Sequence, residues 1–183
     1  MATRAVPAPL ARLPNALTLG RLVLIPVFIV LMVRAGDSHS WTAGIVFGVA
    51  GVTDQIDGFL ARLWHVESRF GKIADPLADR LMIDAAVILL VAYTRLPWAA
   101  LAVIAARDLL LFVGWRVLAP RGVDLEVNAI GKAATWILYA AIGFRIVTHD
   151  ATRWPIWLFW IGVGVALAAA VLYVRDAREE LRR

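Results

Sequence analysis

Four aspartates stand at regular spacing between residues 54 and 79 of a chain that is otherwise mostly apolar. Asp54 and Asp57 are three residues apart, and Asp75 and Asp79 are four residues apart. On helices these spacings place each pair on one face. If the two helices run antiparallel, the faces meet and form one oxygen-rich site. Ionisable groups in membrane helices are costly, so this pattern favours a functional site over internal salt bridges.

Carboxylates gathered in this way either take up protons or bind cations. Mg²⁺ prefers oxygen ligands and commonly completes its coordination with substrate phosphates, and Mn²⁺ is a possible substitute. Two such ions would stabilise the attacking and leaving oxygens of a displacement at phosphorus. Gly58 and Ala61 leave room beside the helix backbone, and Arg62 is suited to bind a phosphate in bidentate fashion. The predicted chemistry is a metal-assisted displacement at phosphorus.

The sequence Asp-x-x-Asp-Gly-x-x-Ala-Arg, eight further residues, then Gly-x-x-x-Asp-x-x-x-Asp resembles the signature of the CDP-alcohol phosphotransferase family. All of its fixed positions are present, namely Asp54, Asp57, Gly58, Ala61, Arg62, Gly71, Asp75 and Asp79. The resemblance implies transfer of a phosphatidyl group from CDP-diacylglycerol to an alcohol, with release of CMP.

The resemblance also implies a role for each position. Asp54, Asp57 and Asp75 would hold Mg²⁺ against the pyrophosphate. Asp79 would share the metal site and accept the proton of the attacking hydroxyl, as a general base. The cytidine and its phosphates would be seated by Gly58, Ala61, Arg62 and Gly71.

A second element, Pro-Asn-x-Leu-Thr-x-x-Arg at residues 14–21, resembles the N-terminal element of the family's glycerol-lineage branch. That branch includes the phosphatidylglycerophosphate and cardiolipin synthases. The resemblance places Asn15, Thr18 and Arg21 near the phosphates of the donor. The alternative is a helix cap followed by an interfacial arginine.

The acceptor is predicted from polar residues farther along the chain. Arg107 and Asp108 fall inside an apolar stretch, where they either form an ion pair or line a cavity; the cavity is favoured because adjacent residues do not face each other on a helix. Lys132 and Thr135 begin a later stretch and resemble part of a phosphatidylglycerophosphate synthase element. Arg145 points either into the site or to the far interface.

Convergent cations favour glycerol 3-phosphate as the acceptor, held by Arg107, Lys132, Thr135 and Arg145. The product would then be phosphatidylglycerol phosphate. The Arg-Asp pair is similar to that of cardiolipin synthases, so phosphatidylglycerol is the alternative acceptor. An alternative of another class is a cation channel or transporter that uses the same aspartates.

Composition sets the fold class. The chain has 183 residues, of which 61% are hydrophobic, and its mean hydropathy is +0.75. These values predict one all-α integral membrane domain over residues 1–183. The net charge of +5 comes with basic residues near the ends of apolar stretches, which indicates contacts with membrane lipids rather than nucleic acid.

Six transmembrane helices are expected after a short interfacial segment at residues 1–13, each about as long as a bilayer requires. Their predicted ranges are 15–35, 41–63, 73–94, 97–118, 129–148 and 156–174, with residues 64–72 as a connection that ends near Gly71. Most Lys and Arg residues fall on the side that holds both termini and the aspartates. The positive-inside rule therefore places that side in the cytoplasm, in a bacterial cytoplasmic membrane. Family resemblance implies a homodimer.

Overall fold

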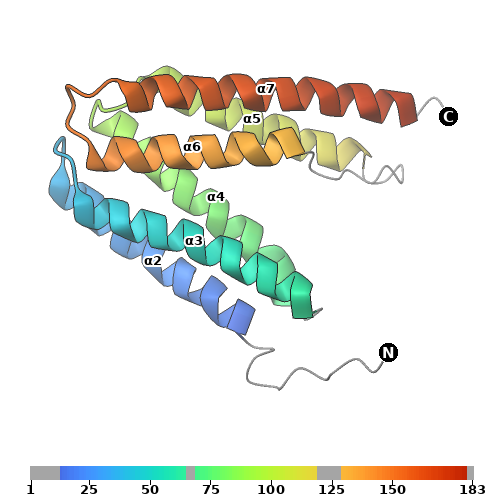
Figure 1. The fold of residues 1–183 in the computed structure, drawn as a ribbon, viewed down its shortest axis with the longest axis horizontal. Helices are drawn as coiled ribbons and strands as arrows, with labels where there is room; N and C mark the ends of the chain where they lie inside the picture. The colour runs from blue at the N-terminus through green and yellow to red at the C-terminus, as the bar shows by residue number, and fades with distance from the viewer. Residues whose placement is uncertain (1–12, 65–68, 119–128, 181–183) are drawn as a thin grey trace. The chain divides into compact units, whose positions relative to one another are not determined.

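The computed structural model describes residues 13–64, 69–118 and 129–180, shown in Figure 1. The backbone of α3 and α4 is described up to residues 65–68, but no side chain from residue 57 to residue 76, nor that of Asp79, is described. The described residues form six helices and no strand, which confirms the all-α expectation. The helices are α2 (Leu13–Ala35), α3 (Trp41–Trp64), α4 (Arg69–Ala92), α5 (Trp98–Leu118), α6 (Ala129–Val147) and α7 (Trp154–Glu180).

The helix boundaries lie close to the predicted ranges, with two larger differences. α4 begins at Arg69, so the prediction that the connection continues to Gly71 is wrong. Gly71 lies in the first turn of α4, where backbone N–H groups lack intrahelical partners and a glycine disturbs little. α7 continues to Glu180 because the polar sequence after its apolar stretch contains Arg, Ala and Glu, which favour helix. The predicted interfacial segment lies mostly outside the described residues.

The chain divides into two compact units, Met1–Leu89 and Leu90–Arg183. The first unit holds α2, α3 and most of α4. The second holds the last residues of α4 together with α5, α6 and α7. Each unit is considered by itself below.

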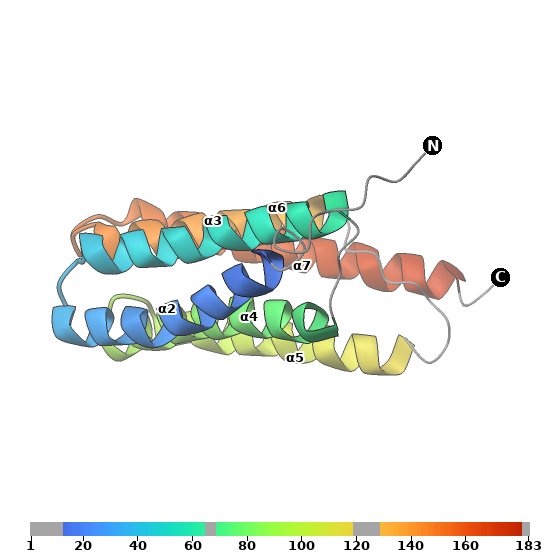
Figure 2. The same ribbon diagram turned by 90° about the horizontal axis from the view of Figure 1, so that it is seen from below.

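In the first unit, α2 packs along α3, and Figure 2 shows the short turn that joins them. Buried residues of α2 recur every three or four positions, which is the spacing of a helix–helix seam. These seam residues are Thr18, Arg21, Ile25, Phe28 and Met32 on α2, and Ala43, Phe47 and Ala50 on α3. The rings of Phe28 and Phe47 lie 5.7 Å apart at the middle of the seam.

The turn between α2 and α3 is capped on both sides. Gly36 has a φ of 60° and donates its N–H to the carbonyl of Met32, which closes the end of α2. The Ser40 hydroxyl accepts a hydrogen bond of 3.1 Å from the N–H of Ala43 and so caps the start of α3. These caps fix the antiparallel register of the pair, and with it which residues meet along the seam.

In the second unit, α6 and α7 lie side by side (Figure 1). Gly162 of α7 lets the two helices pack closely, because a Cβ built there would lie 2.9 Å from Cγ of Leu138 on α6. Leu138, Ile142 and Phe159 are among the buried residues of this pair. The turn at residues 148–153, which follows α6, accepts hydrogen bonds from two buried arginines described below.

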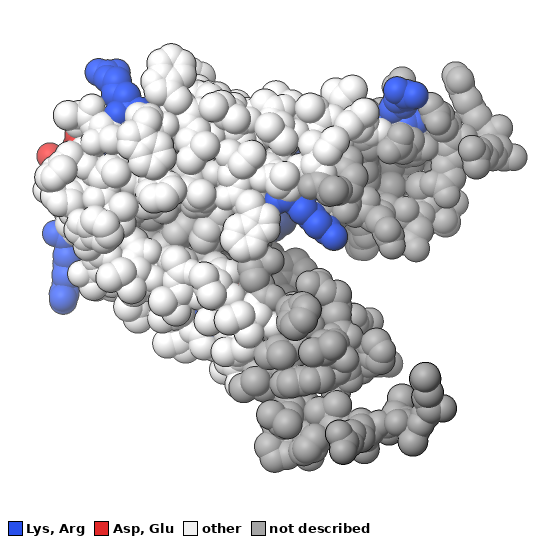
Figure 3. All heavy atoms as spheres, viewed as in Figure 1, with Lys and Arg blue, Asp and Glu red and all other residues white. Residues whose placement is uncertain are grey.

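The exposed surface of the described helices is largely apolar. Large hydrophobic side chains are exposed along α2 and α7, including Val23, Val30, Ile161 and Val171. Figure 3 shows a face on which most described atoms belong to uncharged residues and Lys or Arg side chains occur at a few places. Among the described residues, three segments are long and apolar enough to cross a membrane: Ala16–Ala35, Ile130–Val147 and Trp154–Leu172. For the other three helices, membrane crossing stays a prediction.

Candidate active site

The eight motif positions lie on two helices of the first unit. α3 carries Asp54, Asp57, Gly58, Ala61 and Arg62, and α4 carries Gly71, Asp75 and Asp79. The backbone is helical at each of these positions. Each pair of aspartates therefore lies on a helix, where the i,i+3 and i,i+4 spacings place both members on one face, as expected from the sequence. Of the eight, only the side chain of Asp54 is among those that the structure describes.

Asp54 forms an ion pair with Arg21 of α2, in which Nη1 of the guanidinium donates to Oδ1 of the carboxylate. The Arg21 side chain is 1% exposed, whereas that of Asp54 is 22% exposed. Arg21 thus occupies a buried seam position, and its counter-ion is the first aspartate of the motif. A buried guanidinium in an apolar helix pair needs such a partner, because an unpaired charge there is strongly destabilising.

The other two residues predicted near the donor phosphates also lie on α2. Thr18 is buried one turn before Arg21 on the same seam. Asn15 lies in the first turn of the helix, and its side chain is outside those described. All three positions lie toward the N-terminal end of α2, and the ion pair between Arg21 and Asp54 joins that end to α3.

The donor set suits a hard divalent cation on chemical grounds. Asp54 offers carboxylate oxygen and is partly exposed, so a metal ion can reach it. Among the side chains that the structure describes, no group of three or more His, Cys, Asp or Glu residues could hold a metal ion. Asp57, Asp75 and Asp79 lie outside that set, so the metal site stays a prediction carried by the type and spacing of the ligands.

The residues predicted to bind the acceptor lie in the second unit. Nη2 of Arg107 on α5 is 3.4 Å from the Thr135 hydroxyl on α6, a long hydrogen bond. The Thr135 hydroxyl in turn donates to the carbonyl of Gly131 at 3.1 Å. Lys132 is exposed and lies one turn before Thr135 on α6. The structure thus brings Arg107 and Thr135 together.

Arg107 also approaches its neighbour Asp108, with Nη1 to Oδ1 at 3.6 Å. This distance makes an ion pair but exceeds hydrogen-bonding range for good geometry. The expectation that adjacent residues would not pair is therefore too strict, since long side chains can bend toward each other from neighbouring directions. Both side chains remain partly exposed, at 24% and 20%.

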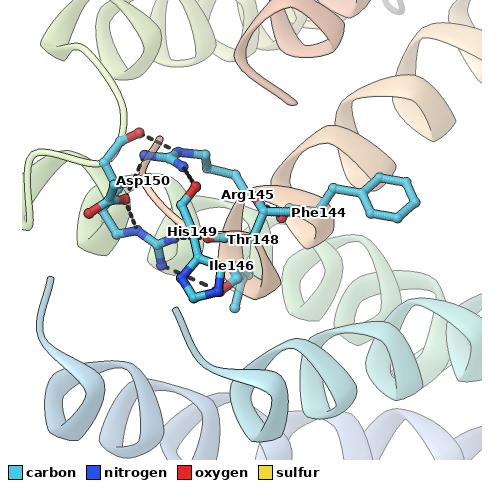
Figure 4. A network of polar contacts seen from close by, with 7 residues as sticks. Phe144, Arg145, Ile146, Thr148, His149 and Asp150 are labelled. Carbon is cyan, nitrogen blue, oxygen red and sulfur yellow. Dashed lines mark hydrogen bonds and ion pairs between the residues drawn. The ribbon is translucent and has the colours of Figure 1, made fainter. Parts of the chain in front are cut away.

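Arg145 lies at the other end of α6, in the polar network of Figure 4. Its Nε donates to the carbonyl of Arg95 at 2.7 Å, and its Nη2 donates to Oδ1 of Asp150 at 2.8 Å. Its Nη1 also donates to the carbonyl of His149 at 3.3 Å. Thirteen residues separate Arg145 from Lys132, which is about 20 Å along a helix. Of its two predicted positions, these contacts favour the one away from Lys132 and Thr135.

Arg95 completes this network from the turn that follows α4. Its guanidinium donates to Oδ1 of Asp150 at 2.9 Å and to the carbonyls of Ile146 and Thr148 at 3.3 and 2.6 Å. The two carbonyls belong to the C-terminal end of α6, so Arg95 acts as a cap for that helix. The sequence did not indicate a role for Arg95 or Asp150, because each stands in a short polar turn that has no motif spacing.

The turn that presents Arg95 is itself well defined. The N–H of Arg95 bonds to the carbonyl of Leu90 at 2.7 Å, and that of Thr94 bonds to the carbonyl of Val91 at 3.0 Å. This pair of bonds is the Schellman arrangement, and Thr94 takes the left-handed position with a φ of 56°. A β-branched residue is strained there, so the surrounding contacts must hold it.

The charges of the network act on Asp150, which lies in the turn outside the membrane-spanning segments. Partial burial acts to raise the pKa of the Asp150 carboxyl. The hydrogen bonds and positive charges of Arg95 and Arg145 outweigh that effect, so its pKa lies below the ordinary value. Asp150 therefore remains ionised at neutral pH and balances part of the charge of the two arginines.

Comparison with known proteins identifies the motif. The CDP-alcohol phosphatidyltransferase family matches residues 11–169, which include every motif position. The chain is 31% identical over 180 residues to the CDP-diacylglycerol–glycerol-3-phosphate 3-phosphatidyltransferase of Escherichia coli (strain K12), covering 92% of this chain and 96% of the relative. Proteins of the same name from Shigella flexneri serotype 5b (strain 8401) and Shigella boydii serotype 4 (strain Sb227) match with the same identity and coverage.

These matches favour the phosphatidyltransferase prediction over a channel or transporter. They extend through both compact units, from α2 into α7, so the resemblance is not confined to the aspartate motif. This chain belongs to the CDP-alcohol phosphatidyltransferase family.

Proposed function

We propose that this protein transfers the phosphatidyl group of CDP-diacylglycerol to glycerol 3-phosphate, giving phosphatidylglycerol phosphate and CMP. The observation that carries the proposal is the complete aspartate motif on α3 and α4 of a chain that belongs to the family. The acceptor is taken from the names of the relatives, which match along nearly their whole length.

In the proposed step, a hydroxyl oxygen of the acceptor attacks the phosphorus that carries the diacylglycerol. A new P–O bond forms, the bond from that phosphorus to the oxygen bridging it to CMP breaks, and CMP leaves with the electron pair. Asp79 accepts the proton of the attacking hydroxyl. Gly58, Ala61, Arg62 and Gly71 seat the cytidine and its phosphates, and Asn15, Thr18 and Arg21 lie on the end of α2 that contacts α3 beside them through Asp54.

Two Mg²⁺ ions, held by Asp54, Asp57, Asp75 and Asp79, would neutralise charge on the transferred phosphoryl group and on the leaving group when bound. The exposed fraction of the Asp54 side chain supports this assignment, because a ligand must be reachable. Mn²⁺ has similar ligand preferences and should substitute.

The acceptor phosphate is assigned to Arg107, Lys132 and Thr135. The contact between Arg107 and Thr135 supports this choice, since it joins α5 and α6 beside the exposed Lys132. A phosphomonoester held there would gain charge-assisted hydrogen bonds, each contributing about 1.5–3 kcal/mol.

The proposal includes a location: an integral protein of a bacterial cytoplasmic membrane, with both termini and the motif facing the cytoplasm, working as a homodimer. Three span-length apolar helices support membrane insertion. Because the chain has no cysteine, Ser38→Cys in the α2–α3 turn and Glu180→Cys at the end of α7 can be labelled cleanly in intact cells. A membrane-impermeant thiol reagent should label the cysteine at position 38 and spare the one at position 180. The homodimer is tested separately, by cross-linking and by measuring the mass of the protein in detergent.

The activity is tested with purified protein in detergent, CDP-diacylglycerol and a panel of acceptors. CMP release should require glycerol 3-phosphate, stop in EDTA and return with Mg²⁺. Full activity in EDTA would contradict the metal assignment. A protein that ignores glycerol 3-phosphate and makes cardiolipin from phosphatidylglycerol would leave the donor site intact and refute the acceptor.

The acceptor residues are tested by KM. Arg107→Gln and Lys132→Gln should each raise the KM for glycerol 3-phosphate by roughly tenfold, with the KM for CDP-diacylglycerol almost unchanged. Arg116→Gln, an exposed arginine in the last turn of α5, is the matched control and should change neither value. Equal effects on both substrates would place these residues outside an acceptor site.

A further inference from the structure

Arg21 cannot easily leave the carboxylate of Asp54. It occupies a buried position of the α2–α3 seam, with Thr18 and Ile25 buried on either side of it. Its side chain is 1% exposed, so moving the guanidinium into water requires opening the helix pair. Asp54 is more exposed, at 22%, and is the member of the pair that outside ligands can reach.

This arrangement has an electrostatic consequence for metal binding. Arg21 donates to Oδ1 of Asp54, so a cation bound by the same carboxylate becomes a near neighbour of a fixed positive charge. Like charges at such separation repel strongly where water is scarce. Arg21 therefore disfavours a divalent cation on Asp54.

The diphosphate of CDP-diacylglycerol carries negative charge that offsets both the guanidinium and the metal. We propose that Arg21 makes metal binding conditional on the donor: the enzyme binds the divalent cation weakly alone and tightly together with CDP-diacylglycerol. This inference rests on the metal site of the proposed function. Because such coupling is reciprocal, the metal raises donor affinity by the same factor.

The coupling also has a use in the membrane. Four carboxylates balance two divalent cations, so a metal-loaded site without donor would leave the charge of Arg21 in excess and attract phosphate-bearing lipids nearby. With Arg21 in place, metal loading is favoured when a diphosphate supplies the balancing charge. Arg21 is in this sense a positioning residue for Asp54 and a determinant of the order of binding.

The experiment measures Mn²⁺ affinity by electron paramagnetic resonance on full-length protein in detergent, with and without CDP-diacylglycerol and with no acceptor present. In the wild type, donor should lower the Kd for Mn²⁺ by at least about tenfold. In Arg21→Gln, the donor-free protein should bind Mn²⁺ about tenfold more tightly than the wild type, and the effect of the donor should shrink accordingly.

Two variants serve as controls. Arg21→Lys keeps the charge and should retain most of the coupling. Arg34→Gln removes an exposed arginine in the last turn of the same helix and should leave Mn²⁺ affinity unchanged. If Arg21→Gln does not fold, the wild-type measurement still decides, because absence of coupling between Mn²⁺ and donor refutes the inference.

The failures can be told apart. Equal or weaker donor-free Mn²⁺ binding in Arg21→Gln would overturn the role of Arg21 while leaving the metal site standing. A wild type that binds no Mn²⁺ under either condition, and whose activity is insensitive to EDTA, would instead overturn the metal site of the proposed function.

Discussion

Among the described residues, buried arginines occur in both compact units, and their guanidinium groups have different kinds of partner. In the first unit, Arg21 pairs with Asp54, an aspartate of the family motif. In the second, Arg95 and Arg145 converge on Asp150 and on backbone carbonyls at the end of α6 and in the turns after α4 and α6. Both clusters bury guanidinium groups among apolar side chains, where a lone charge would be destabilising.

The partners distinguish the two clusters. Arg95 satisfies two carbonyls at the end of α6, and Arg145 donates to carbonyls in the turns after α4 and α6, so their contacts stabilise a helix end and two turns. Arg21 donates to Asp54, a carboxylate that also belongs to a predicted metal site. Burial and pairing of a charge therefore do not by themselves indicate function. What indicates function is whether the partner group is also expected to bind a metal or substrate.

The largest expected effect is a difference in activity between variants of Asp54 and of Asp150, the carboxylates that pair with the buried arginines. Asp54→Asn should lower kcat by at least about 100-fold, because it weakens a metal ligand while keeping size and hydrogen bonding. Asp150→Asn should leave the kcat of folded protein within about twofold. CMP release from CDP-diacylglycerol measures both. Comparable losses in the two variants would remove the functional distinction between the clusters.

The second effect concerns stability in the second unit. Arg145→Met should lower the free energy of unfolding by about 1–3 kcal/mol, since the carbonyl of Arg95 loses its buried donor from Arg145 while Asp150 keeps the hydrogen bond from Arg95. Arg153→Met, an exposed arginine of the same turn, is the matched control and should change stability little. Denaturant unfolding in detergent measures the difference. If the two variants are equally stable, the network does not hold the turn.

A smaller effect follows from the lowered pKa of Asp150. A carboxyl whose pKa is depressed by folding contributes stability above its unfolded pKa, about 3.9, and loses that contribution as the pH falls through the folded value. Because Asp150 is 55% exposed, water weakens the effect. The Tm of the wild type should therefore fall more steeply below about pH 4 than that of Asp150→Asn. Superimposable pH profiles of Tm would show that the ion pairs add nothing.

The smallest effect compares the turns that end α2 and α4. Thr94→Gly should raise stability by about 0.5–1 kcal/mol, since it relieves a left-handed β-branched residue while keeping the Schellman bonds. Gly36→Ala, at the equivalent left-handed position after α2, should lower stability by about 1 kcal/mol. Both are read from Tm. A destabilised Thr94→Gly would mean that the Thr94 side chain makes contacts that outweigh the strain.

The sequence predicted most of the local structure because its signals are local. Long apolar stretches define the helices, and the boundaries found for α2, α3, α5 and α6 lie within two residues of those expected. The spacing of the aspartates predicted their helical positions and their chemistry, since ligand type and period are properties of the chain alone. The start of α4 was misjudged because Gly71 looks like a breaker but lies in a first turn, where glycine is tolerated.

The pairing of charges was decided by tertiary structure. Arg21 looked like a phosphate ligand on sequence grounds, and only the register of α2 against α3, fixed by the caps at Gly36 and Ser40, brings it onto Asp54. Arg145 could point either way along its helix until the turn after α4 brought Arg95 against the end of α6. A sequence lists which charges must find partners, but long-range contacts choose the partners, because residues tens of positions apart meet only when helices pack.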